Sequence, residues 1–301
     1  MLHKFISLNI TRRRAQIILG VYWLIAGCLQ LQSQMFSSNF ITQVIKPVTQ
    51  NQPMFITGPI NFTVHIFLVN PVLFNAFIAL VQLCLGIFII WQRSTTYAIT
   101  ASVFWAIFVW FFGEAMGQLW GGHNLLMMGA PGAALLYALI ALGVMPKKGS
   151  DEKPDDWLIL VWVAVWLMGS ILQLVNGQNT SSELASMISS LAGNGAPQWL
   201  SALDIGISNL VSGLGNWFIA LLVAVQAAIG LLVLYPNKYV RIITIELAII
   251  LLAAFWVVGQ NLGGYYTGYA TDVNSAPLII LLGLSIIELK LKSSDYIDGI
   301  V

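Results

Sequence analysis

Residues 104–122 read FWAIFVWFFGEAMGQLWGG, and residues 250–268 read ILLAAFWVVGQNLGGYYTG. The second stretch repeats the first at an offset of 146, with a tryptophan and three glycines kept in register. Each stretch joins a long apolar run to a glycine-rich end, which predicts a duplicated membrane unit. The matched pairs are Trp110 with Trp256, Gly113 with Gly259, Gly117 with Gly263 and Gly122 with Gly268, followed by Pro131 with Pro277.

The repetition continues toward the N-terminus of each half at nearly the same offset. At an offset of 143, Trp23, Leu29, Gln30 and Leu31 match Trp166, Leu172, Gln173 and Leu174. At an offset of 144, Phe74, Gln82 and Gly86 match Phe218, Gln226 and Gly230. We therefore expect two repeats joined by a short polar linker. Their ranges are 1–149 with an outer loop at 37–71, the cytoplasmic linker 150–156, and 157–301 with an outer loop at 177–214.

Composition excludes a soluble globular protein. Of the 301 residues, 58% are hydrophobic and only 8% are charged, and the mean hydropathy is +0.83. Soluble domains carry about 25% charged residues. The net charge of +1 and the lack of a basic tract argue against nucleic acid as a partner, which leaves the lipid bilayer. Cys28 and Cys84 lie in apolar runs without metal-ligand spacing, so we expect both to be small buried residues.

Hydropathy predicts an all-α polytopic fold. A transmembrane helix needs about 20 mostly apolar residues, and eight segments meet this requirement. Each repeat holds four of them, an even number, so the repeats run parallel and are related by an axis along the membrane normal. The expected spans are 16–36, 72–91, 97–119, 130–146, 157–176, 215–235, 241–262 and 276–292.

Basic residues predict the orientation. Every Lys and Arg except Lys46 falls in alternate connections or at the ends of the chain, which predicts a multi-pass protein of the cell's inner (plasma) membrane with both termini in the cytoplasm. No cleavage site follows Arg12 to Arg14, so the first span is expected to be retained. In the outer connections, small polar and apolar residues alternate along Ser182–Leu191 and Trp199–Leu210, as they do in interfacial helices. Loops packed against one another are the alternative.

Polar residues interrupt the small-residue motifs. Glycines four residues apart at 113, 117 and 121 predict a helix face that packs closely on another helix. Glu114 lies within this motif, and an ionisable residue in a span is a functional candidate; a hydrogen-bonded structural carboxylate is the alternative. Gln30, Gln82, Gln173 and Gln226 add a polar column, although interhelical amide hydrogen bonds would also explain them. The ligand-binding candidates are Glu114, Gln118, Gln30, Gln173, Gln260, Asn261 and Asp272.

Two further features of the outer turns have competing interpretations. Asp272 and Asn274 stand just before Pro277, where helix capping is an alternative to ligand binding. His123, Met127 and Met128 have the soft-ligand character that would suit copper. We treat these three residues as the candidate metal ligands.

Two copies of a four-helix unit with small-residue motifs in the third helix resemble a duplicated DoxX-type membrane protein. The tract at 259–278, GQNLGGYYTGYATDVNSAPL, is similar to a Gly-rich Thr-Asp-Pro-Asn signature of uncharacterised bacterial membrane proteins, with Val273 in place of the proline. The resemblance implies association with membrane redox systems such as thiosulfate:quinone oxidoreductase, and hence with quinone and other membrane subunits. It supplies no catalytic residue.

Two functions follow as hypotheses. In the first, a polar pocket between the repeats, open to the outside, binds or transports a small solute or a metal ion. In the second, the chain is an accessory or anchoring subunit of a quinone-linked membrane redox complex. An autonomous enzyme is the least favoured class, because no span offers paired histidines at haem spacing and no nucleophile–base pair stands out.

Overall fold

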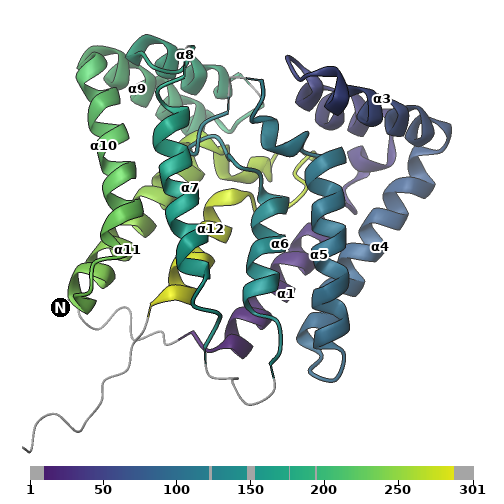
Figure 1. The fold of residues 1–301 in the computed structure, drawn as a ribbon. Coiled ribbons are helices and arrows are strands. Elements are labelled where there is room, and N and C mark those ends of the chain that lie inside the picture. The colour runs from purple at the N-terminus through teal and green to yellow at the C-terminus, as the bar shows by residue number, and fades with distance from the viewer. Residues whose placement is uncertain (1–9, 122–123, 148–152, 176, 194, 288–301) are drawn as a thin grey trace, which may run out of the picture.

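The computed structural model describes residues 10–121, 124–147, 153–175, 177–193 and 195–287, and in these ranges the chain forms helices and turns without any strand. Four helices from each half of the sequence run side by side (Figure 1). Those of the first half are α1 (Arg12–Leu29), α4 (Pro71–Ile90), α5 (Thr95–Phe112) and α6 (Ala133–Gly143). Those of the second half are α7 (Leu158–Leu172), α10 (Asn216–Leu232), α11 (Lys238–Ala254) and α12 (Ser275–Ile286).

The connections at 37–71 and 177–214 contain helices, which lie across the ends of the eight helices named above (Figure 1). In the first half, short turns lead into α3, and the chain then turns into α4. In the second half, α8 begins with a capping box between Thr180 and Glu183, and α9 meets α10 at a bend of 103°. The elements are η2 (Ser33–Phe36), α2 (Ser38–Phe40), η3 (Ile41–Ile45), η4 (Pro47–Thr49), α3 (Met54–Val69), α8 (Ser181–Leu191) and α9 (Gln198–Leu214).

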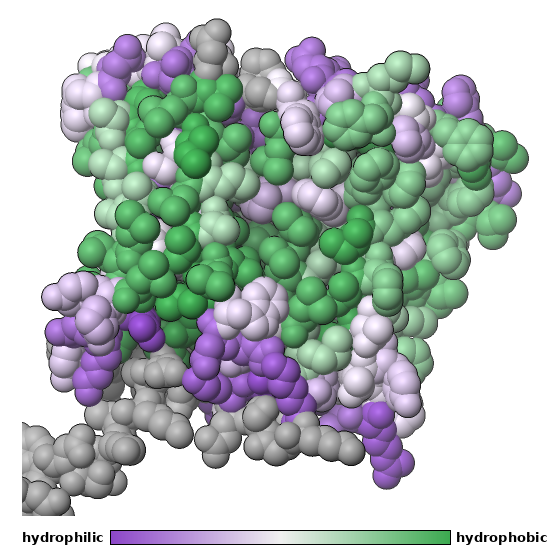
Figure 2. Space-filling model, in the orientation of Figure 1, coloured by the Kyte–Doolittle hydropathy of each residue, from purple (hydrophilic) through white to green (hydrophobic). Residues whose placement is uncertain are grey.

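The surface has the composition of a membrane protein. Within the described ranges, three helical segments are long and apolar enough to cross a bilayer, namely α4, α5 and Lys238–Gly259, and the bent pair α9–α10 would make a fourth. Figure 2 shows a hydrophobic belt between more polar ends. Cys28 is exposed and Cys84 half-buried, so the expectation that both are buried is wrong. An apolar residue in a membrane helix can equally face lipid.

Several helices end earlier than the hydropathy predicts. The expected span at 97–119 is wrong at its C-terminal end, because α5 stops at Phe112. The span at 241–262 likewise changes at Phe255 into a π-helical turn, η6 (Phe255–Gly259). The small-residue face predicted at 113, 117 and 121 is therefore broken, and neither Gly117 nor its match Gly263 lies on a helix face.

Close helix packing occurs instead between α1 and α4. A Cβ atom added at Gly86 would lie 2.7 Å from the carbonyl oxygen of Gly20, and one added at Gly27 would lie 2.9 Å from the backbone nitrogen of Leu83. Such distances are below van der Waals contact, so these glycines allow the two backbones to approach. The small-residue principle holds in this protein, but it acts in a different helix pair.

A polar network joins the start of α1 to the end of α6 and to the start of the second half. Arg12 is 3% exposed and pairs with Asp155, with 2.8 Å between Nη2 and Oδ1. The same guanidinium donates to the carbonyl oxygens of Gly143 and Met145. Gln16, one turn along α1, donates to the carbonyl oxygen of Val144 at 2.7 Å. These bonds compensate the burial of a charged side chain.

Two contacts between the halves join residues separated by the offsets of the sequence repeat. Arg12 and Asp155 are 143 residues apart. At the other end of the helices, the Ser275 hydroxyl donates to the carbonyl oxygen of Gly129 at 2.5 Å, across 146 residues. Residues that lie on a two-fold axis contact their own equivalents. Arg12 with Asp155 and Gly129 with Ser275 are such pairs, because their separations equal the offsets of the repeat.

Candidate functional site

Two runs of left-handed backbone follow α5 and α11, and we call each of these interruptions a break. Residues 115–118, which include η5 (Met116–Gln118), have φ between 47° and 68°. Residues 261–264, which form η7 (Asn261–Gly264), have φ between 50° and 70°. Each is a run of four left-handed residues, and the two runs are 146 positions apart. A left-handed conformation costs a non-glycine residue about 1–2 kcal/mol, so the surrounding structure must hold these turns in place.

The residue before each left-handed run accepts a hydrogen bond from a later helix. Both carboxylate oxygens of Glu114 accept from the backbone N–H of Ala134, the second residue of α6, at 3.1 and 3.2 Å. Gln260 does the same in the second half, where its Oε1 accepts from Ala276, the second residue of α12, at 3.1 Å. The first N–H groups of a helix lack internal partners and favour negative charge. Glu114 and Gln260 therefore each cap the short helix that follows.

A tryptophan in each half holds the returning segment. The indole N–H of Trp110 donates to the carbonyl oxygen of Pro131 at 2.8 Å, and that of Trp256 donates to Val273 at 3.2 Å. Both tryptophans precede their break by one helical turn. The tryptophan pair matched in the sequence thus has the same structural role in both halves.

Asp272 reaches from the second half toward Glu114. Its Oδ1 accepts from the backbone N–H of Asn274 at 2.6 Å, and its Oδ2 accepts from the Thr271 hydroxyl at 3.0 Å. Neither Asp272 nor Asn274 caps α12 with its side chain. The capping interpretation of these two residues is therefore wrong, because the cap is supplied by Gln260.

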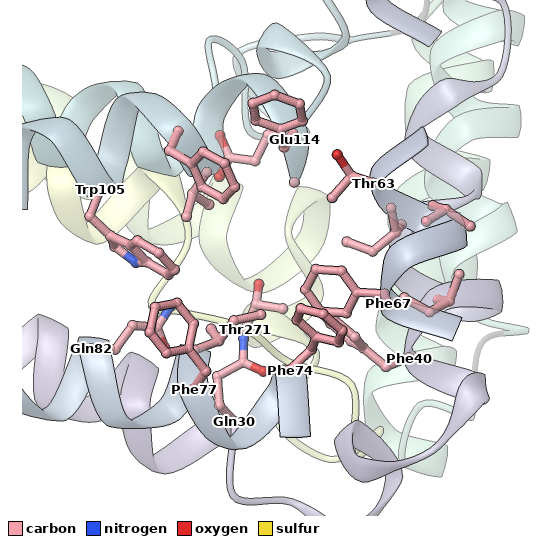
Figure 3. Close-up of a pocket in the computed structure, with 18 of the residues that line it drawn as sticks. Gln30, Phe40, Thr63, Phe67, Phe74, Phe77, Gln82, Trp105, Glu114 and Thr271 are labelled. Atoms are coloured by element: carbon pink, nitrogen blue, oxygen red, sulfur yellow. The ribbon is translucent and has the colours of Figure 1, made fainter. Parts of the chain in front are cut away.

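Glu114, Thr271 and Asp272 line two neighbouring cavities. The smaller, about 210 Å³, is bounded by polar backbone and by Gln118, Asn274 and Ser275, among others. The larger, about 280 Å³, is mostly apolar and lies between α3, α4 and α5 (Figure 3). Among the described residues that line them, Glu114 and Asp272 are the only charged ones. One carboxylate from each half of the chain therefore stands where the two cavities adjoin.

The larger cavity also contains polar atoms without partners. Gln30 and Gln82 line it, are 3% and 4% exposed, and have no hydrogen bond to their Oε1 atoms within the described structure. The indole nitrogen of Trp105 is also unpartnered there. Buried polar atoms usually have a partner, so three unpartnered polar atoms on residues of one cavity lining are unusual.

The corresponding place in the second half is filled. The Nε2 of Gln260 donates to the carbonyl oxygen of Met127 at 3.5 Å, and a Cβ atom added at Gly259 would lie 2.3 Å from that same oxygen. Leu126, the equivalent of Asp272 at an offset of 146, is 1% exposed and packs where a side chain at Gly169 would begin, 2.7 Å from its Cβ position.

The structure separates the predicted ligand-binding residues into two groups. Glu114, Gln118, Gln30 and Asp272 line the cavities. Gln173 donates to the carbonyl oxygen of Gln178, and Asn261 to that of Leu191. Together with Gln260, these two residues line neither cavity.

Only two of the three predicted metal ligands lie within the described residues. His123 lies outside the described residues, Met127 is buried, and Met128 lines the smaller cavity. No group of three His, Cys, Asp or Glu side chains comes together within the described ranges.

The aromatic lining of the larger cavity was not predicted. The residues belong to four different segments: Trp105 of α5 lies edge-on to Phe77 of α4, and Phe67 of α3 lies beside Phe74 of α4 (Figure 3). The run at 104–112 gave a signal, since six of its nine residues are aromatic, but aromatic residues are also common against lipid. The lining rings are Phe40, Phe67, Phe74, Phe77, Trp105, Phe108 and Phe112.

Comparison with known proteins gives no assignment: no family model, no curated protein and no solved structure matches this chain.

Proposed function

We propose that the chain crosses the bacterial plasma membrane eight times as two parallel four-helix repeats, with both termini in the cytoplasm. The two contacts at offsets 143 and 146 support the two-fold relation. The 11 residues of α6 make about 16 Å of helix, roughly half of a hydrocarbon core about 30 Å thick. The polar breaks that precede α6 and α12 would then lie at membrane depth, which is tolerated where such backbone is buried in protein or lines a cavity.

The topology has a direct test. A reporter fused after Val301 should be cytoplasmic, and one inserted near Gly177 should be extracytoplasmic, because the Lys and Arg residues fall in alternate connections. Reporters on the same side would contradict the eight-span arrangement.

The function that this site supports best is binding, and by extension transport, of a small positively charged solute. The observation that carries the proposal is that Glu114 and Asp272, one from each half, line both cavities without any Lys, Arg or His among the described lining residues. Carboxylates enclosed by protein are costly unless a cation or a proton accompanies them. The cavities adjoin α3 and the breaks, at the end of the helices opposite Arg12, which is the outer side in the proposed topology.

The experiment compares purified wild type with Glu114→Gln and Asp272→Asn in detergent. Thermal unfolding is measured with the chlorides of sodium, potassium, methylammonium and guanidinium at equal ionic strength. A cation that binds only the folded protein raises the melting temperature with concentration. We expect at least one of the four to do so in wild type and to lose most of this effect in both variants.

Glu114→Gln should fold well, because Gln260 shows that an amide oxygen can cap the following helix from this position. The matched control is Asp156→Asn, which makes the same chemical change at a side chain that is 78% exposed. If all four proteins respond alike to every salt, the proposed function is wrong. Subunits that co-purify with an unresponsive protein would instead favour the accessory role in a redox complex.

A further inference from the structure

The larger cavity has one apolar region and one polar region. The apolar region is formed by aromatic rings in contact with one another: Phe77 and Trp105 have ring centroids 6.1 Å apart, and Trp105 and Phe108 5.5 Å apart. The polar region holds Glu114 and Asp272. At about 280 Å³ the cavity is close to the lower end of the roughly 300–1,000 Å³ of small-molecule sites. A solute without an apolar body would leave most of this lining uncovered.

The cavity reaches the hydrophobic surface of the protein. Phe77 and Phe108 both line it, and they are 55% and 44% exposed. They belong to α4 and α5, which are two of the helices long and apolar enough to cross a membrane. An apolar molecule dissolved in the bilayer could therefore enter between these helices without passing through water.

Charge selects among apolar ligands. The faces of Trp and Phe rings attract cations, and the carboxylates of Glu114 and Asp272 do so more strongly. Gln30 and Gln82 also line the cavity, but their unpartnered Oε1 atoms are fully buried. The carboxylates and the ring faces both favour a positively charged group, and neither favours an anion.

We infer that the larger cavity binds a hydrophobic organic cation, an amine or quaternary ammonium with an aromatic or branched apolar body. The charged group lies toward Glu114 and Asp272, and the apolar body lies among the rings of Phe77, Trp105 and Phe108. This inference rests on the proposed function and narrows its solute class.

The test uses three probes that separate charge from apolar body. Benzyltrimethylammonium has both, tetramethylammonium has the charge alone, and neopentylbenzene has the shape without the charge. Binding to the full chain in detergent is measured by isothermal titration calorimetry, with empty micelles as the blank. We expect benzyltrimethylammonium to bind about 10- to 100-fold more tightly than tetramethylammonium, the ratio that burial of one aromatic ring provides. We expect no saturable binding of neopentylbenzene.

Trp105→Leu provides the residue-level test, with Phe104→Leu as the matched control. Trp105 lines the cavity, whereas its neighbour Phe104 is 74% exposed and does not. Loss of the Trp105 ring should weaken benzyltrimethylammonium binding roughly 2- to 10-fold, as expected for the loss of a contact between two aromatic rings. It should leave tetramethylammonium binding less affected. Phe104→Leu should bind like wild type.

The outcomes distinguish this inference from the proposed function. If benzyltrimethylammonium binds no better than tetramethylammonium, or if both leucine variants bind it like wild type, the inference is overturned. The proposed function survives that result when salt-dependent stabilisation is still lost in Glu114→Gln. Equal binding of neopentylbenzene and benzyltrimethylammonium would overturn the inference as well, because it would show a purely apolar site.

Discussion

The break after α5 and the break after α11 have the same backbone and different contents. In both, a residue caps the next short helix, four left-handed residues follow, and an indole N–H holds the returning chain. In the first half the capping residue is Glu114 and its neighbour from the other half is Asp272. In the second half these positions are Gln260 and Leu126. The first arrangement borders two cavities, and the second is filled by the segment around Met127.

This difference shows which features serve the fold and which distinguish one half. The cap and the left-handed turn are common to both halves, so a carboxylate is not needed to form them. The acidic pair and the two cavities it borders lie at the first break, where the second half contributes Asp272. A duplicated scaffold that keeps its backbone while one copy acquires charge and open space is the expected form of a single site built from two unlike halves.

The largest expected effect on stability comes from substituting the matched glycines of the two left-handed turns. Gly117 and Gly263 have nearly equal φ values, 68° and 70°. A Cβ atom at Gly117 would lie 1.9 Å from the carbonyl oxygen of Pro131, whereas one at Gly263 would lie 3.1 Å from the ring of Tyr265. Gly263→Ala should therefore cost about 1–2 kcal/mol from the left-handed conformation alone. Gly117→Ala should cost several times more, or prevent folding.

Melting temperature and yield of folded protein in detergent give the measurement. Gly58→Ala is the control, because a Cβ atom there meets nothing within 4 Å and its φ is not left-handed. Equal losses at Gly117 and Gly263 would show that the carbonyl of Pro131 can move aside. Packing of glycine faces between helices would not distinguish the two positions in this way.

The architecture could be predicted from the sequence because it depends on repeated signals. The hydropathy profile located eight helical segments, and the matched Trp110 and Trp256 gave the correspondence between the breaks. The helix ends could not be predicted, since Gly117 and Gly263 fit a helix face as well as a left-handed turn. The left-handed turn is tied to a hydrogen bond that the backbone N–H of Ala134 donates to Glu114, 20 residues earlier in the chain. Local sequence patterns do not record such a bond.

The candidate site was predicted in part for the same reason. Glu114 and Asp272 were identifiable as costly residues in apolar surroundings. Glu114 and Asp272 lie close together only because the segment before α12 packs against the first half, and no local sequence pattern records that packing. The aromatic lining comes from α3, α4 and α5 together, and a sequence cannot show which faces of three helices converge.

The two contacts that join equivalent residues also differ, and they give the smallest expected effect. Arg12 with Asp155 is a charged pair, whereas Gly129 with Ser275, at the other end of the helices, is a neutral hydrogen bond. Burial acts to raise the pKa of Asp155, but hydrogen bonds from Lys147 and Arg12 outweigh it, so this pKa lies below its ordinary value. Only the charged contact should therefore make stability depend on pH.

The sign follows from the lowered pKa of Asp155. A carboxyl group whose pKa is lower in the folded than in the unfolded protein contributes its full stabilisation above the unfolded pKa, about 3.9. That contribution is lost as the pH falls through the folded pKa. The difference in melting temperature between wild type and Asp155→Asn should thus stay constant from about pH 8 to 5 and shrink below about pH 4. Ser275→Ala should lower the melting temperature by an amount that does not change over this range, because no ionisable group is removed. A gap for Asp155→Asn that persists undiminished to about pH 3 would mean that Arg12 is held by the carbonyl groups of Gly143 and Met145, and that the charged pair adds nothing to the junction of the two halves.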